Sequence, residues 1–153
     1  MIQEFDVLFL REGIRLAEEA ERRGNLPVGA LVVLDGEIVA SGMNHIWQPE
    51  LAMTRHAEME ALRSLPPELR VRCGEMTLYT TLEPCLMCAG AILLHQIGRL
   101  VFGAVDPNAG VRGCLPALPQ CFKDNYMRME WEGPALAVEC DPLYERLQEL
   151  KQG

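Results

Sequence analysis

The stretch that organises the chain runs from Thr80 to Ala91 and reads TTLEPCLMCAGA. Within it, Cys85 and Cys88 follow Pro84, a residue suited to the first position of a helix. Two thiols three residues apart on a first helical turn lie on one face of the helix, where they can bind one metal ion. A second string, His-Ala-Glu at residues 56–58, offers a third ligand and a carboxylate. The sequence therefore predicts a metal site assembled from two separated strings.

The donor set of this site indicates its chemistry. Of the three histidines, only His56 stands beside a carboxylate in a motif. His56, Cys85 and Cys88 make three ligands for Zn²⁺, and an open fourth position distinguishes a catalytic zinc site from a closed structural one. Zinc lowers the pKa of bound water to about 7, and Glu58 is placed to move the protons that hydrolysis requires. The two strings together predict hydrolytic deamination.

The order of the predicted elements indicates an α/β fold. Apolar periodicity predicts a helix over 4–23, and Asp35-Gly36 predicts the turn of a hairpin between strands at 30–34 and 37–41. Further elements are expected as a helix over 55–65 capped by Thr54, a strand over 76–80, a helix over 85–96, strands over 100–103 and 126–132, and a helix over 142–151. Residues 42–53 are expected to form a loop, and 113–120 either a short helix or a loop.

Strands that are joined through intervening helices run parallel. We therefore expect a three-layer α/β/α sandwich around a mixed five-stranded sheet, with helices on both faces. The 153 residues are of ordinary single-domain size, so we expect one domain over residues 1–153. The six cysteines need no disulfide framework in a chain of this kind. We expect Cys73, Cys114, Cys121 and Cys140 to be small buried hydrophobic residues.

Composition narrows the classes of partner and compartment. No apolar run is long enough to span a bilayer, and acids occupy the N-terminus where a signal peptide carries cations, so we expect a cytoplasmic protein with no membrane partner. The net charge is −8, with two lysines against twelve arginines. Residues 113–153 carry four basic and seven acidic side chains. Because nucleic-acid binding draws its affinity from cations, this balance weakens nucleic-acid hypotheses.

The motifs resemble those of the zinc-dependent cytidine deaminase superfamily, and most closely its tRNA adenosine deaminase-like branch. The resemblance covers about residues 5–113 and then fades; it is carried by the two metal strings together with Pro27–Ala30, Ile97–Arg99, Val101–Ala104 and Asp106. It implies a cytidine deaminase-like fold, a homodimer and Zn²⁺ as the cofactor. It also implies His56, Cys85 and Cys88 as zinc ligands, Glu58 as the proton shuttle, and Asn44, Ala57 and Val28 as substrate contacts.

Three functions remain open at this stage. The acidic charge favours deamination of a free nucleobase or nucleoside with release of ammonia, and this is the expected activity. The resemblance favours instead an adenosine at the anticodon wobble position of tRNA, converted to inosine. A non-catalytic, zinc-stabilised interaction module is the third alternative.

The sequence does not decide the role of several residues near the two strings. Asn44 is either a substrate contact or a turn residue. Trp47 either stacks on a base or packs at a subunit interface. His45 and Arg55 are expected to be solvated, and Glu83 is either a structural residue or one that supports the metal site.

Overall fold

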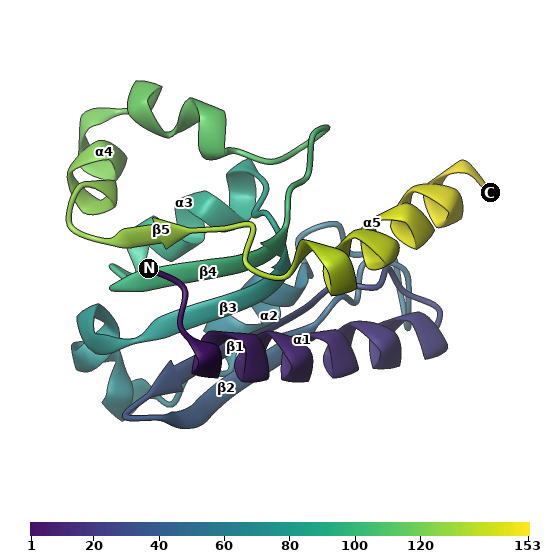
Figure 1. Cartoon of the computed structure of the whole chain (residues 1–153), viewed down its shortest axis with the longest axis horizontal. Coiled ribbons are helices and arrows are strands. Elements are labelled where there is room, and N and C mark those ends of the chain that lie inside the picture. The colour runs from purple at the N-terminus through teal and green to yellow at the C-terminus, as the bar shows by residue number, and fades with distance from the viewer.

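The computed structural model describes residues 1–153 and contains one mixed five-stranded sheet (Figure 1). The strands are β1 (Gly29–Leu34), β2 (Glu37–Met43), β3 (Thr77–Leu82), β4 (Arg99–Ala104) and β5 (Glu130–Glu132). Their spatial order is β2-β1-β3-β4-β5. The β1 strand pairs antiparallel with both neighbours, whereas β3, β4 and β5 run parallel. The predicted α/β class and mixed five-stranded sheet are confirmed.

Helices cover both faces of the sheet. Figure 1 shows α1 (Glu4–Arg22) and α5 (Ala137–Gln152) in front of the strands, and α2 (Ala57–Arg63) and α3 (Leu86–Leu94) behind them. On the α1 face, Leu10 packs with Leu31 and Tyr79. On the other face, Val32 and Leu78 belong to a larger core that also includes residues of α2 and α3. All six residues of β1 are buried, as expected for a strand covered on both faces.

Two glycines allow helices to lie directly on the sheet. A Cβ atom on Gly29 of β1 would lie 2.1 Å from the carbonyl oxygen of Gly13 in α1. A Cβ atom on Gly42 of β2 would lie 2.4 Å from the carbonyl oxygen of Ala57, the first residue of α2. Only glycine permits so close a backbone approach. The second contact fixes the start of α2, and with it the position of His56.

Several predicted boundaries are wrong. The N-cap of α2 is His56 rather than Thr54, and that of α3 is Cys85. The predicted strand over 126–132 is reduced to β5, because α4 (Gln120–Tyr126) extends to Tyr126 and residues 127–129 form the turn that follows it. The ambiguous segment begins with a 3₁₀ helix, η2 (Arg112–Ala117), and a second one, η1 (Pro67–Glu75), precedes β3.

The last helix begins earlier than expected and contains Pro142. Its start is fixed by the sheet, because the N–H groups of Ala135 and Leu136 donate to carbonyl oxygens of Phe102 and Gly103. The proline leaves the carbonyl of Val138 without its helical partner. Val138 is 90% exposed, so water can satisfy that carbonyl.

The cysteines outside the metal strings divide into two groups. Cys73 and Cys140 are buried, as predicted. Cys114 and Cys121 are exposed, so the expectation of burial is wrong for these two. They lie on η2 and α4, two helices whose residues do not belong to the main core.

None of the helices combines the length and apolar character that a membrane crossing requires. The assignment of residues 1–153 to one domain stays a prediction.

Candidate active site

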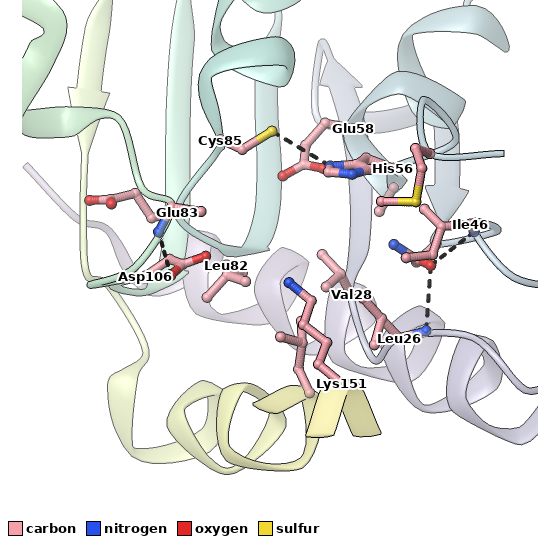
Figure 2. A pocket seen from close by; sticks show the side chains of 15 residues that line it. Leu26, Val28, Ile46, His56, Glu58, Leu82, Glu83, Cys85, Asp106 and Lys151 are labelled. Carbon is pink, nitrogen blue, oxygen red and sulfur yellow. Dashed lines mark hydrogen bonds between the residues drawn. The ribbon is translucent and has the colours of Figure 1, made fainter. Parts of the chain in front are cut away.

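The two metal strings meet at the N-termini of two neighbouring helices (Figure 2). Nδ1 of His56 lies 3.6 Å from Sγ of Cys85 and 3.6 Å from Sγ of Cys88. The ligand atoms of these three residues all lie within 4.8 Å of one another. Helix N-termini present backbone N–H groups and a positive dipole, which favour thiolate sulfur. The fold therefore brings together three side chains separated by up to 32 residues in sequence.

The spacing of these three donors fits a zinc ion. Tetrahedral Zn²⁺ with Zn–S and Zn–N bonds of about 2.3 and 2.0–2.1 Å places nitrogen and sulfur ligands about 3.6 Å apart. The two nitrogen–sulfur separations have this length. One imidazole and two thiols are also the borderline-soft donors that zinc prefers, and they are not those of magnesium or calcium. The chemistry and the geometry of the donor set agree.

The two thiols differ in acidity because they share a hydrogen bond. The hydrogen bond from Cys88, together with one from His56, lowers the pKa of Cys85 to about 4 against the opposing effect of burial. The same contact, together with burial, raises the pKa of Cys88. The hydrogen bond to Cys85 also raises the pKa of His56. The cluster therefore presents an anionic sulfur at neutral pH, which suits a cation.

Glu58 is a buried carboxyl group beside this cluster, only 4% exposed. Its Oε1 accepts a hydrogen bond of 3.1 Å from the Thr80 hydroxyl, and its Oε2 lies 3.5 Å from Sγ of Cys88. Burial raises the pKa of Glu58. A carboxyl group whose pKa is raised toward neutrality can both accept and release a proton. Its position and acidity match those of a general acid–base group.

A pocket opens in front of the cluster. Every predicted site residue except Cys88 lines it, namely Val28, Asn44, His56, Ala57, Glu58 and Cys85. Cys88 is fully buried behind the others. The pocket is also lined by nine residues outside the predicted set of site residues: Leu26, Ile46, Met53, Leu82, Glu83, Asp106, Ala109, Leu147 and Lys151. Figure 2 shows Lys151 extending from α5 toward the pocket.

The amide group of Asn44 has a fixed orientation. Its Oδ1 accepts hydrogen bonds from the backbone N–H groups of Leu26 and Ile46, at 3.4 and 3.2 Å. Two N–H donors identify this atom as the oxygen, so the Nδ2 donor faces away from them. Oδ1 of Asn44 therefore stabilises a turn, while Nδ2 is available to a group in the pocket. The turn role and the substrate-contact role of Asn44 are compatible.

The other residues near the strings are engaged elsewhere. Trp47 packs against the main core and does not line the pocket. Arg55 pairs with Glu60, and the His45 ring bonds to the Met43 carbonyl. Glu83 does line the pocket, and burial raises its pKa. Of these four residues, only Glu83 contributes to the site.

Comparison with known families agrees with this geometry. Residues 3–104 match the family model for the cytidine and deoxycytidylate deaminase zinc-binding region. The chain belongs to the zinc-dependent cytidine deaminase superfamily. As a member of this superfamily it is an enzyme, a hydrolase that acts on carbon–nitrogen bonds, and the predicted cytidine deaminase-like fold is confirmed.

Relatives within the superfamily place the chain in its tRNA adenosine deaminase-like branch. The tRNA-specific adenosine deaminase of Bacillus subtilis (strain 168) is 40% identical over 136 residues, which are 88% of this chain and 83% of that protein. The tRNA-specific adenosine deaminase of Aquifex aeolicus (strain VF5) is 33% identical over 145 residues, 94% of each chain. A solved structure from work on A-to-I editing by tRNA:A34 deaminases at the wobble position of transfer RNA is 36% identical, with a TM-score of 0.67 over 75% of this chain and 91% of that one.

These relatives correct two expectations. A match over 145 residues continues well beyond residue 113, where the sequence motifs fade. The preference for a free nucleobase or nucleoside as substrate is wrong, because proteins similar over most of the chain are named tRNA-specific adenosine deaminases. Net charge misled because it describes the whole surface. It does not describe the pocket, which is lined mostly by apolar side chains.

Proposed function

We propose that this chain is a tRNA adenosine deaminase that converts adenosine at the anticodon wobble position to inosine and releases ammonia. The observation that carries the proposal is the similarity to tRNA-specific adenosine deaminases over most of the chain. The grouping of His56, Cys85, Cys88 and Glu58 around one pocket supports it, because hydrolytic deamination needs a metal ligand set and an acid–base group side by side.

His56, Cys85 and Cys88 hold Zn²⁺ in this proposal. When bound, the metal supplies a Lewis acid that makes hydroxide available near neutral pH. The net reaction forms a bond between C6 of the adenine ring and a water oxygen, and breaks the bond between C6 and the exocyclic nitrogen. The water must therefore lose protons, and the ring nitrogen and the departing amine must gain them.

Glu58 moves these protons. It is the carboxyl group next to the ligand cluster, and the hydrogen bond from Thr80 fixes one of its oxygens. Asn44 supports the substrate with its Nδ2 donor, which suits an acceptor nitrogen or hydroxyl oxygen of the nucleoside. Val28 and Ala57 form apolar walls on which the base lies.

Product analysis on a panel of substrates tests the proposal. The zinc-loaded protein is incubated with a tRNA anticodon stem-loop carrying adenosine at the wobble position, with the same stem-loop carrying guanosine there, and with free adenosine, adenine, guanine and cytidine. We expect inosine and ammonia from the first substrate only. Turnover of a free base or nucleoside without turnover of the stem-loop would contradict the proposal.

We also propose that the chain acts as a homodimer. The outer face of α3 exposes Leu86 at 65% and Leu94 at 59%. Leu86 also lines an apolar pocket with Leu118 and Phe122. Exposed apolar patches of this kind are typical of protein interfaces. Light scattering should give a dimer for the natural chain and a monomer for Leu86→Glu; a natural chain that is monomeric at micromolar concentration would contradict this.

A further inference from the structure

Arg112, the first residue of η2, contacts three segments near the pocket. Its Nη1 donates a hydrogen bond of 3.1 Å to the carbonyl oxygen of Gly133. Its Nε lies 3.7 Å from Oε1 of Glu83, and its Cζ lies 5.8 Å from the centre of the Phe102 ring. A planar guanidinium can make these contacts together, because its donors point in several directions while its face stacks on a ring.

The contact with Glu83 supports one wall of the pocket. The Glu83 side chain is only 4% exposed, and Arg112 is its ion-pair partner. The backbone of the following loop lies against the carboxylate, since a Cβ atom on Gly110 would fall 1.3 Å from Oε2 of Glu83. The N–H of Val111 also donates to the carbonyl of Pro84 at 3.1 Å. Residues 106–111, which include two lining residues, therefore rest on Glu83 and its neighbour.

The contact with Gly133 supports a second wall. Gly133 packs so closely on Phe102 that a Cβ atom would lie 2.7 Å from the ring. Two residues later, the N–H of Ala135 donates to the Phe102 carbonyl at 2.9 Å. This segment leads directly into α5, which contributes Leu147 and Lys151 to the pocket. Arg112 thus links the base of the 106–111 loop to the segment that places α5.

We propose that Arg112 is a positioning residue for substrate binding, because its guanidinium ties two walls of the pocket together through Glu83 and Gly133. Arg112 does not line the pocket, so it acts on the shape of the walls and not on the reacting atoms. A wall displaced equally in the ground and transition states changes KM and leaves kcat unaltered. The identity of the substrate rests on the proposed function, whereas the tie between the walls is a property of the free protein.

Hydrogen–deuterium exchange on the free, zinc-loaded protein tests the tie directly. The variant Arg112→Met removes the guanidinium and keeps an apolar stem over the Phe102 ring. Arg72→Met is the matched control, since Arg72 also joins two segments, through the carboxylates of Asp35 and Glu75, but does not line the pocket or contact its walls. We expect exchange to accelerate about tenfold in both 105–111 and 133–137 for Arg112→Met, as hydrogen bonds to charged groups contribute in that range. Unchanged exchange in either segment would overturn the proposal.

Kinetics on the wobble-adenosine stem-loop test the consequence. For Arg112→Met we expect KM to rise about tenfold with kcat within a factor of two, from the same hydrogen-bond range. Arg112→Lys keeps the charge near Glu83 but lacks the planar fork, so it should recover only part of the loss. Full recovery by lysine, or a fall in kcat with KM unchanged, would overturn the positioning role. If the natural chain does not deaminate the stem-loop, the proposed function fails, while the exchange result still decides the role of Arg112.

Discussion

The acid–base and ligand roles within the site can be separated, because Glu58 and Cys88 differ in what they offer a cation. Both side chains are buried, and they contact each other at 3.5 Å. Cys88 belongs to the group of three donors with zinc-like spacing, whereas Glu58 lies outside that group. Loss of a ligand and loss of the acid–base group should therefore give different results.

We expect Cys88→Ala and His56→Ala to lose zinc together with activity. Glu58→Gln should keep close to one zinc per chain and lose about 10²–10⁴ in kcat, the usual contribution of a general acid–base group. Metal content by plasma emission spectroscopy and single-turnover deamination measure the two effects. Equal loss of zinc in all three variants would contradict the assignment of roles.

At this scale the motifs predicted the chemistry but not the pocket. His56, Glu58 and Cys85 were predictable because each lies in a short string whose spacing reflects one metal site. Leu147 and Lys151 were not, since the position of α5 depends on contacts between distant segments.

Single helices are held to the sheet by contacts that can be tested individually. The approach of α1 to β1 depends on Gly29, where a Cβ atom would lie 2.1 Å from a backbone oxygen. Backbone atoms cannot move aside as the end of a side chain can. Gly74 in η1 offers a matched control, because nothing lies within 4 Å of a Cβ atom placed there.

Gly29→Ala should destabilise the protein by at least about 1–3 kcal/mol, the cost of overpacking a core. For a domain of this size that lowers Tm by roughly 2–4 °C per kcal/mol. Gly74→Ala should leave Tm unchanged within about 1–2 °C, as surface substitutions do. Thermal unfolding followed by circular dichroism compares the two, and equal Tm values would show that α1 does not press on β1.

The N-terminus of α1 is joined to the sheet by a buried carboxylate. Asp6 is 0% exposed and accepts hydrogen bonds from Arg99 at 2.7 Å and from the Tyr79 hydroxyl at 2.6 Å. Burial raises the pKa of Asp6, but these hydrogen bonds outweigh it and hold the pKa below its ordinary value of 3.8. A carboxyl group with a lowered folded-state pKa adds stability above its unfolded pKa and loses it as pH falls through the folded pKa.

Asp6→Asn should therefore destabilise the protein at pH 7 by about 1.5–3 kcal/mol, the contribution of hydrogen bonds to a charged group, since Arg99 keeps Glu130 and Glu132 as partners. The difference between natural chain and variant should stay constant down to about pH 5 and shrink below about pH 4, where Asp6 takes up a proton in the unfolded chain before it does so in the folded one. Urea unfolding from pH 7 to pH 3 measures it. A difference that grows on acidification would contradict the lowered pKa.

Short sequence patterns predicted the elements whose conformation depends on neighbouring residues in the chain. The hairpin of β1 and β2 follows from its Asp35-Gly36 turn, and both residues have positive φ angles, of 53° and 78°. The early start of α5 was not predictable, because it depends on hydrogen bonds to β4, more than thirty residues away. A helix that continues through Pro142 contradicts the local rule and is stabilised by the sheet.

For the whole molecule, the acidic charge bears on how tRNA is held, although it did not decide the substrate. The chain carries a net charge of −8, and Lys151 is the one cation that lines the pocket. Arg11 of α1 and Arg146 of α5 are paired with Glu139 and Glu21. Few cations are therefore free to displace counterions from a tRNA backbone.

We expect a shallow dependence of stem-loop binding on salt. A protein that makes six to ten phosphate contacts loses about 10³–10⁵ in affinity between 50 and 200 mM salt, whereas one or two contacts cost about tenfold or less. Affinity here should fall by the smaller amount, so recognition depends mainly on the base in the pocket and on shape.

Fluorescence anisotropy with the stem-loop and zinc-loaded Glu58→Gln, which binds without turnover, measures the dependence of affinity on salt. Lys151→Met should flatten it further, and Lys123→Met, a cation on α4 outside the pocket, should not. If the protein that keeps both lysines loses a hundredfold or more in affinity between 50 and 200 mM salt, the expectation is contradicted. Cations outside the pocket would then contact the RNA.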